Sequence, residues 1–364
     1  MRLVFFVHSL VSDWNHGNAH FLRGVARELI ARGHEVAVYE PEDAWSRDNL
    51  VRRNGERPLR EFARAFPELT SRTYGRDLDV DAALDGADVA IVHEWNEPWL
   101  VQRVGRSSVP SLFHDTHHRA VTSPGELRRY DLSGFAGVLA FGAAVASVYR
   151  ERGWHDRVWI WHEAADVALF RPLRRAKQAD LVWIGNWGDG ERSAELRRFL
   201  LQPARRLGLT GTIHGVRYPP EAVRAVERAG LHWGGWLANH RVPEVFARHR
   251  VTVHVPRRPY VRALPGIPTI RPFEALACGI PLVSAHWEDA EGLFRPGEDY
   301  LVARNGRELE RHLRDVLADP SLARSLARSG RSTVLARHTC AHRVDELLGV
   351  LRELGVRDLK VVAA

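Results

Sequence analysis

Short apolar runs alternate with amphipathic segments over most of this chain. The run "LVFFVH" from Leu3 is continuous and rich in branched and aromatic residues, which is typical of a parallel strand covered on both faces. Residues 19–33 place apolar side chains at helical spacing and end at a glycine, and "HEVAVYE" is the next strand candidate. This order of strand, helix and strand predicts a parallel sheet with right-handed connections.

The same alternation continues on both sides of one interruption, the charged segment 164–180, which has no sustained period and favours a linker. Residues 41–80 are expected to form a helical or irregular excursion. We therefore predict an α/β protein with two Rossmann-like domains, residues 1–172 and 178–340. Further strands are expected at residues 87–94, 110–116, 136–142, 157–163, 180–186, 210–215, 231–236, 250–256 and 280–284.

Length and composition agree with two globular domains. A chain of 364 residues exceeds the size at which one hydrophobic core keeps growing, and 45% apolar residues suffice for two cores. No run approaches about 18 apolar residues, so no membrane span is expected. The apolar N-terminus lacks a small-residue cleavage site and is interpreted as a core strand. Two cysteines, Cys278 and Cys340, cannot form a framework of disulfides, which fits a cytoplasmic protein.

The net charge of +7 is carried mostly by arginines, which suggests anionic partners. These arginines are scattered over helix faces, and no nucleic-acid motif or zinc-finger spacing is present. We therefore expect no nucleic-acid partner, whereas peripheral contact with an anionic membrane surface stays open.

Function is expected in the loops that follow the strands, because ligands bind at the carboxyl ends of open parallel sheets and in clefts between domains. Neither opening strand is followed by G-x-G-x-x-G, and no Walker phosphate loop occurs, which argues against a nicotinamide enzyme.

The segment "RPFEALACGIPLVS" from Arg271 contains one isolated carboxylate, Glu274. Pro272 suits the first helical position, which would place Glu274 in the first turn. Two interpretations stay open at this point. Glu274 caps the helix by accepting a backbone N–H bond, or it accepts hydrogen bonds from the hydroxyls of a ribose. The free N–H groups of this helix end, together with Arg271, make a possible diphosphate seat.

Other residues of the second half are diphosphate candidates. Arg192, Arg257 and Arg258 follow strands, and each is as readily a surface arginine as a phosphate ligand. Gly185 and Asn186 either allow backbone to approach phosphate or form an ordinary turn.

The first half contains the candidates for acceptor binding and catalysis. "FHDTHH" places His114, Asp115, His117 and His118 after a strand, where a histidine can take a proton and an aspartate can orient it. A metal site is the rival interpretation, but the spacing matches no standard zinc motif and no metal is expected. Weaker acceptor-side candidates, each also a plausible loop or capping residue, are Gly17, Asn18, His20 and Glu94, with His16 beside them.

Several segments in this order resemble glycosyltransferases of the two-Rossmann GT-B architecture, particularly the CgeB-like and glycogen-synthase-like (glycosyl transferases group 1) family. These segments are "GNAHFLRGVARELIARGHEVAVYEPED", "WHEAADVALFRP", "DLVWIGNWGDGER", "RPFEALACGIPLVS" and "GLFRPGEDYLV". The resemblance implies that the two domains face each other across a cleft, that Glu274 contacts a ribose, and that residues 341–364 form a helix crossing back to the first domain. Many relatives have a second glutamate eight residues before Glu274, where this chain has Gly266.

The resulting hypothesis is a metal-independent glycosyltransferase that uses a UDP- or GDP-linked sugar as substrate and needs no other cofactor. The acceptor is a small molecule, glycan or protein. In an inverting enzyme His114, His117 or Asp115 would be the base, whereas in a retaining enzyme these residues would orient or stabilise. The alternatives are a sugar-nucleotide epimerase or phosphorylase on the same fold, and a non-catalytic carbohydrate- or nucleic-acid-binding protein.

Overall fold

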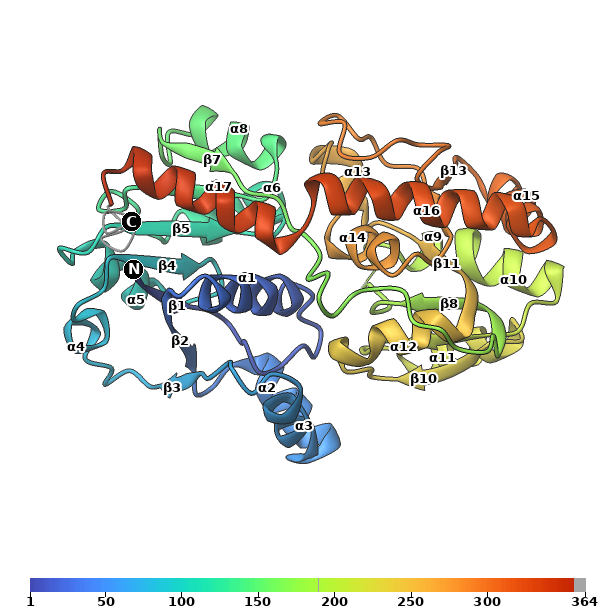
Figure 1. Ribbon diagram of the computed structural model, residues 1–364, viewed down its shortest axis with the longest axis horizontal. Coiled ribbons are helices and arrows are strands. Elements are labelled where there is room, and N and C mark those ends of the chain that lie inside the picture. The colour runs from blue at the N-terminus through green and yellow to red at the C-terminus, as the bar shows by residue number, and fades with distance from the viewer. Residues whose placement is uncertain (189, 357–364) are drawn as a thin grey trace. The chain divides into compact units, whose positions relative to one another are not determined.

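The computed structural model describes residues 1–188 and 190–356 and divides into two compact units. Unit 1 comprises Met1–Glu163 together with the chain from Cys340 onward, and unit 2 comprises Ala164–Thr339. The chain therefore leaves unit 1 and returns to it for its last helix (Figure 1).

Unit 1 is built on a seven-stranded sheet with the order β3-β2-β1-β4-β5-β6-β7, in which every pair is parallel. Its strands are β1 Arg2–Phe6, β2 Glu35–Pro41, β3 Arg72–Tyr74, β4 Val89–His93, β5 Ser111–Asp115, β6 Gly137–Ala140 and β7 Val158–Ile160. Its helices are α1 Ala19–Ala31, α2 Trp45–Asn54, α3 Arg57–Ala65, α4 Val80–Leu84, α5 Pro98–Gly105, α6 Arg119–Thr122, α7 Pro124–Leu127, α8 Ala143–Glu151 and α17 Cys340–Glu353.

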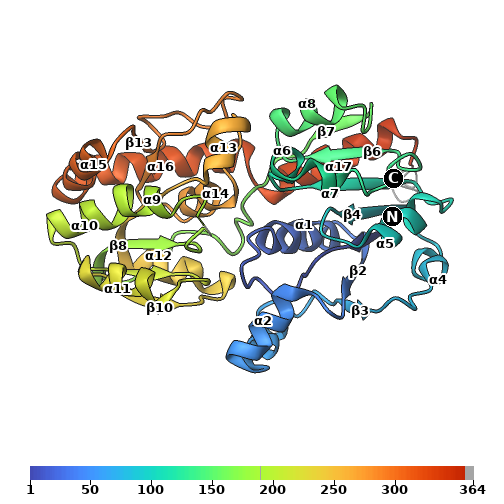
Figure 2. The same cartoon turned by 180° about the vertical axis from the view of Figure 1, so that it is seen from behind.

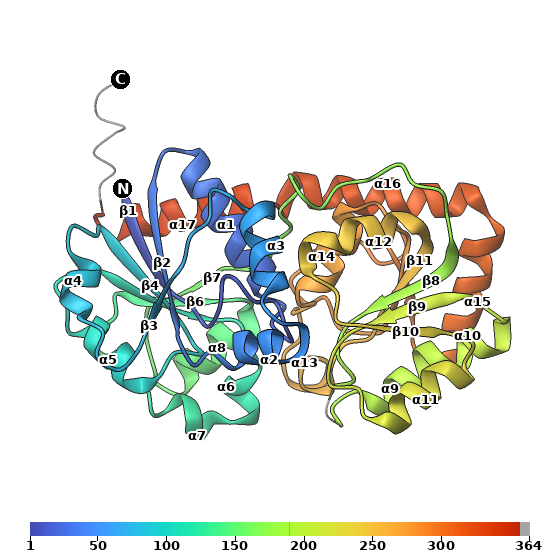
Figure 3. The ribbon, with the colours of Figure 1, turned by 90° about the horizontal axis from the view of Figure 1, so that it is seen from below.

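Helices cover both faces of this sheet, with α1 and α17 on one face and α8 on the other (Figure 3). The central strands are apolar on both faces for this reason, and their side chains are fully buried along β4 and β5. α17 packs against α1, which fixes the end of the chain on unit 1 (Figure 2). The strand order reverses between β1 and β4, and the loops after such a pair of strands are where ligands of open parallel sheets bind.

Unit 2 repeats this architecture with a six-stranded parallel sheet of order β10-β9-β8-β11-β12-β13. The reversal of strand order lies between β8 and β11. The strands are β8 Ala179–Ile184, β9 Gly211–His214, β10 His232–Gly235, β11 His249–His254, β12 Leu282–Ala285 and β13 Leu301–Ala303. The helices are α9 Ser193–Leu196, η1 Arg197–Leu201, α10 Gln202–Leu207, α11 Pro220–Arg228, η2 Asn239–Arg241, α12 Val242–Arg248, α13 Arg258–Ala263, α14 Ile270–Ala277, α15 Gly306–Ala318 and α16 Pro320–Arg337.

The predicted fold class of two Rossmann-like α/β domains is confirmed. The edge strands β3 and β13 were not predicted, because each has only three residues and no alternation over that length can be recognised. No helix among residues 1–188 and 190–356 is long and apolar enough to cross a membrane.

The change of unit lies at Glu163–Ala164, before the expected domain end at residue 172. Ala165 pairs with Thr339 of unit 2, and Phe170 is fully buried in the core of that unit. The last described helix, α17, covers the first part of the helix expected at 341–364, and residues 357–364 lie outside the described residues.

Gly330 sets how closely α16 approaches α14, the helix that contains Glu274. A Cβ at this position would lie 2.6 Å from Cδ2 of Leu276 and 2.8 Å from the carbonyl oxygen of Asp299. We expect Gly330→Ala to destabilise unit 2 by about 1–3 kcal/mol, because the extra methyl forces the two helices apart. Urea denaturation monitored by tryptophan fluorescence measures the change.

Gly349 in α17 is the matched control. A Cβ there would meet nothing nearer than 3.9 Å, so Gly349→Ala should stabilise the chain by about 0.5–1 kcal/mol through helix propensity. Equal effects of the two substitutions would contradict the close packing of α14 and α16.

Candidate functional site

Helix α14 begins two residues earlier than the position of Pro272 predicted. Ile270 is its first residue, so Pro272 is the third and Glu274 the fifth, beyond the first turn. The prediction of Pro272 at the first position and Glu274 in the first turn is therefore wrong. Proline fits any position of the first turn, because the N–H groups there have no partner within the helix. Thr269 precedes the helix with a φ of 61°, a strained left-handed conformation for a branched residue.

Glu274 is fully buried, and two side chains hold its carboxylate. Nδ2 of Asn239 donates a hydrogen bond of 2.7 Å to Oε1, and the guanidinium of Arg271 donates to Oε2. Asn239 lies in η2, after β10, so this contact joins two segments that are distant in the sequence. Glu274 is the fifth residue of α14, so it does not stand at the third position from which a glutamate caps a helix start. A buried carboxylate needs such partners because burying an unpaired charge is very costly.

Three arginines converge at the carboxyl ends of β8 and β11. Arg192 donates to the side-chain oxygen of Asn186 at 2.7 Å, and Arg257 donates to the same atom at 3.0 Å. Burial, followed by the positive charge of Arg257 and then of Arg271, lowers the pKa of Arg192 to about 9. The nearby carboxylates are Glu191, which pairs with Arg257, and Glu274, which pairs with Arg271. This arginine cluster, Arg192, Arg257 and Arg271, therefore has more positive than negative charge.

The positive charge of the arginine cluster also acts on His254, at the end of β11. Burial, and then the charges of Arg192 and Arg271, lower its pKa to about 3. A neutral imidazole thus adds no further charge to the cluster.

The other predicted diphosphate residues lie close to the arginine cluster: Gly185 and Asn186 in the loop after β8, and Arg258 at the start of α13. Position 185 has no room for a side chain. A Cβ there would lie 2.8 Å from the ring of Trp183 and 3.1 Å from a guanidinium nitrogen of Arg192. The Arg192 guanidinium lies over the Trp183 ring at 5.1 Å. Arg258 donates to the carbonyl of Glu191 at 3.0 Å and is placed differently from Arg257, tying α13 to the loop after β8.

In unit 1, four buried histidines form a row across the carboxyl ends of β1, β4 and β5. The ring centroids of His8, His16, His93 and His114 follow one another at 5.3, 6.0 and 5.5 Å, and Trp161 lies 4.8 Å beyond His114. Burial lowers the pKa of all four, to about 4 for His8 and about 3 for His114. The row is therefore uncharged at neutral pH. Across residues 1–188 and 190–356, no three or more His, Cys, Asp or Glu side chains are arranged to hold a metal ion.

His114 and Asp115 were both predicted as catalytic residues. They are adjacent on β5, so their side chains point to opposite faces of the sheet and Asp115 cannot orient His114. In the described part of the chain neither ring nitrogen of His114 has a hydrogen-bond partner, and a group with a pKa near 3 is a weak base at neutral pH. Asp115 is fully buried and accepts from the Tyr149 hydroxyl at 2.8 Å and from the His117 N–H at 3.0 Å. His117 is partly exposed and packs against Trp95 at 5.2 Å.

Glu94 is buried and ion-paired rather than displayed to an acceptor. Arg119 donates to it at 2.8 and 3.1 Å, and the Thr116 N–H donates at 3.1 Å. Burial, and then the charge of Asp115, raise the pKa of Glu94 to about 8. Arg119, which sequence reasoning missed, also lies over the Trp95 ring at 4.0 Å. This network fixes the loops after β4 and β5, including the segment that contains His117.

The remaining acceptor-side candidates surround the start of α1. Gly17 is exposed in the preceding loop, and His20 is buried on the helix. Asn18 is buried and donates from Nδ2 to Glu163 at 3.3 Å.

Gly266, which stands where relatives have a second glutamate, has a φ of 88°. A Cβ there would lie 2.8 Å from Oε1 of Glu291. The Glu291 carboxylate therefore lies beside this position, although it belongs to a later loop and no sequence motif marks it.

Comparisons with known proteins agree with this architecture. Residues 192–349, less than half of the chain, match a family model described as glycosyl transferase-like. No curated protein sequence matches significantly.

Three solved structures illustrate the shared fold. Anabaena HepE in complex with UDP has a TM-score of 0.68 and 14% identity, over 97% of this chain and 100% of that one. Sucrose-phosphate synthase from Thermosynechococcus elongatus has a TM-score of 0.66 and 15% identity, over 97% and 98%. An α-glucosyltransferase in complex with UDP and a 13-mer DNA has a TM-score of 0.65 and 11% identity, over 97% and 99%.

The predicted GT-B fold is confirmed, and residues 192–349 match a glycosyl transferase-like family model. The narrower resemblance to the CgeB-like group stays a prediction.

The buried histidine row predicts a loss of stability in mild acid. His114 is neutral when folded and takes a proton with a pKa of 6.5 when unfolded, so its contribution is complete above pH 6.5 and falls as the pH drops toward 3. His114→Leu removes this proton binding and keeps an apolar side chain beside Trp161. We compare the free energy of unfolding of the variant with that of wild type at each pH. The difference, variant minus wild type, should be about 2 kcal/mol more favourable to the variant at pH 5 than at pH 7.5.

Urea denaturation at pH 7.5, 6 and 5 measures this change. His232→Leu, at an exposed position of β10, is the control and should not alter the pH profile. Parallel profiles of His114→Leu and wild type would show that His114 is accessible to protons in the folded chain.

Proposed function

Starting from a chain with the GT-B fold and a glycosyl transferase-like second unit, we propose that it transfers a sugar from a nucleoside diphosphate sugar to an acceptor hydroxyl. The donor is UDP- or GDP-linked. The acceptor is a small molecule, glycan or protein rather than a nucleic acid, since the arginines of this chain form no nucleic-acid motif. The two buried free cysteines agree with action in the cytoplasm.

The observation that supports this proposal most directly is the arginine cluster. Arg192, Arg257 and Arg271 lie at the reversal of strand order in unit 2, where ligands of such sheets bind. Their excess positive charge suits a diphosphate, and guanidinium groups bind phosphate oxygens through paired hydrogen bonds. During transfer the same charges would stabilise the leaving diphosphate, which is the contribution a metal ion makes in other enzymes. We therefore propose that the transfer is metal-independent.

Glu274 and Arg271 connect phosphate binding to ribose binding in this proposal. Arg271 neutralises the buried Glu274 carboxylate and belongs to the arginine cluster. We assign the ribose hydroxyls to Glu274, because an ionised carboxylate has acceptor positions left beside its bonds to Asn239 and Arg271. A ribose reaches this buried carboxylate by displacing neighbouring side chains. Asn239 orients this carboxylate from η2.

Acceptor recognition is assigned to the loops at the carboxyl edge of unit 1. His114 and Asp115 are buried, whereas His117 retains exposed surface beside Trp95. We therefore assign acceptor contact to His117, with Glu94 and Arg119 positioning its loop. Glu291 in unit 2 is a candidate contact for the transferred sugar, because its carboxylate lies beside Gly266.

Nucleotide binding tests the arginine cluster. We expect UDP or GDP to bind at least about tenfold more tightly than the monophosphate, because the second phosphate meets the unbalanced arginines. Arg192→Gln and Arg257→Gln should each weaken diphosphate binding by about tenfold and leave nucleoside binding unchanged. Isothermal titration calorimetry with nucleoside, monophosphate and diphosphate measures each affinity.

Arg262→Gln is the matched control, since Arg262 is exposed on α13 outside the cluster. The proposed donor site would be rejected if nucleoside, monophosphate and diphosphate bound with equal affinity, or if Arg262→Gln weakened binding as much as Arg192→Gln.

Turnover distinguishes transfer from the other reactions on this fold. We expect nucleoside diphosphate release from the preferred nucleotide sugar to rise strongly on addition of an acceptor and to persist in excess EDTA. Glu274→Gln, which keeps the shape of the side chain, should reduce donor affinity about tenfold or more. Chromatography of the nucleotide products follows both quantities.

An epimerase would isomerise the donor without an acceptor, and a phosphorylase would require inorganic phosphate. Loss of turnover in EDTA, restored by a divalent cation, would exclude the metal-independent mechanism.

A further inference from the structure

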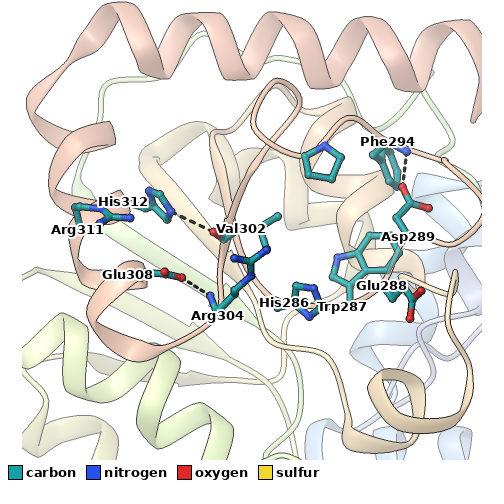
Figure 4. A pocket seen from close by; sticks show the side chains of 11 residues that line it. His286, Trp287, Glu288, Asp289, Phe294, Val302, Arg304, Glu308, Arg311 and His312 are labelled. Atoms are coloured by element: carbon teal, nitrogen blue, oxygen red, sulfur yellow. Dashed lines mark hydrogen bonds between the residues drawn. The ribbon is translucent and has the colours of Figure 1, made fainter.

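A pocket with many polar side chains lies in unit 2 among residues that the proposed donor site does not use. It has a volume of about 520 Å³ and is formed by the loop after β12, the end of β13 and the first turns of α15 (Figure 4). Its lining residues are His286, Trp287, Glu288, Asp289, Phe294, Pro296, Val302, Arg304, Glu308, Arg311 and His312. A pocket of this size accommodates a small organic molecule.

The walls of this pocket are held by hydrogen bonds within unit 2. Asp289 accepts from the N–H groups of Leu293 and Phe294 at 2.9 and 2.8 Å, which closes the loop after β12. On the other side Glu308 accepts from the N–H of Arg304 at 2.7 Å at the start of α15. His312 is hydrogen-bonded to the carbonyl of Val302 at 3.1 Å. The pocket is therefore a built feature rather than a gap between loose loops.

Several polar groups of the lining are left over after these bonds. Within the described residues, the guanidinium groups of Arg304 and Arg311 have no hydrogen-bond or ion-pair partner, although both line the pocket. Trp287 is only 5% exposed, and its Nε1–H has no partner in the described part of the chain. An unsatisfied buried N–H is costly, so a ligand that accepts from it gains affinity.

The charges divide the pocket into two ends. Arg304 and Arg311 lie toward α15, where Glu308 is engaged by backbone, and Figure 4 shows Glu288 and Asp289 at the opposite end. Between them the Trp287 ring, stacked on Tyr300 at 6.4 Å, and Phe294 provide apolar surface. A ligand that fits has an anionic group for the arginines and a ring bearing hydroxyls, which donate to Glu288 and accept from Trp287.

We propose that this pocket binds an anionic sugar, with its phosphate or carboxylate group held by Arg304 and Arg311 and its ring against Trp287. The proposal goes beyond the donor site, because none of the pocket residues belongs to the arginine cluster or to the Glu274 contacts. It does not depend on which nucleotide sugar the enzyme uses.

Calorimetric titration of the full chain with glucose 6-phosphate, glucuronate, glucose and inorganic phosphate tests the proposal. We expect at least one of the two anionic sugars to bind at least about tenfold more tightly than both glucose and inorganic phosphate. Binding of the phosphate ester alone assigns a phosphorylated sugar, and binding of glucuronate alone assigns a sugar acid. The proposal is overturned if neither anionic sugar binds below about 10 mM, or if glucose binds equally well.

Four variants locate the binding. Arg304→Gln and Arg311→Gln should each weaken binding of the anionic sugar by about fivefold or more. Trp287→Phe, which removes the N–H and part of the ring surface, should weaken it several-fold. Arg307→Gln is the matched control, because Arg307 is an exposed residue of the same helix outside the pocket. Equal weakening by Arg307→Gln, or no weakening in the other three, would overturn the assignment.

UDP titrated into the same variants separates this pocket from the donor site. Arg304→Gln should bind UDP as wild type does, and UDP at saturation should not displace the anionic sugar. Displacement by UDP would show that the sugar occupies the donor site and would overturn the proposal. Absence of both UDP and GDP binding in all proteins would reject the donor-site proposal alone.

Discussion

The fully buried carboxylate of Glu274 constrains the carboxyl edge of unit 2 more than any other group. A buried charge must be neutralised and hydrogen-bonded. Arg271 from the same helix supplies the opposite charge, and Asn239 from η2 donates a hydrogen bond. The pair fixes α14 against the segment after β10 and directs Arg271 toward the loops after β8 and β11. Close packing of α16 at Gly330 holds α14 in the position where these contacts form.

The arginine cluster differs from the Glu274 carboxylate in that its charge is only partly neutralised. Asn186 is a neutral acceptor shared by Arg192 and Arg257, so the guanidinium groups are oriented without being fully neutralised. The lowered pKa values of Arg192 and His254 both result from burial in a positive field. A site arranged in this way binds an anion with little rearrangement, since the donors are already held in place.

Unit 1 also buries ionisable side chains, but it leaves little net charge among them. Its four histidines are kept neutral by burial, and the charge of Glu94 is compensated by Arg119. Neutral rings and a paired carboxyl give the loops after β4 and β5 a fixed shape with little net charge. This arrangement suits recognition of an uncharged hydroxyl, whereas unit 2 is suited to a diphosphate.

The sequence by itself determined the fold class and most strands, because buried parallel strands are continuous apolar runs. It also indicated the loops in which we propose the function, because the order of the strands sets where the carboxyl edges meet. It also singled out Glu274 and Arg192. The contact of Glu274 with Asn239, and the sharing of the Asn186 oxygen by Arg192 and Arg257, were decided only by the tertiary structure. The folding of the sheet brings together loops separated by tens of residues. The start of α14 at Ile270 and the burial of His114 likewise depend on packing against other elements, and local propensity contains no information about such packing.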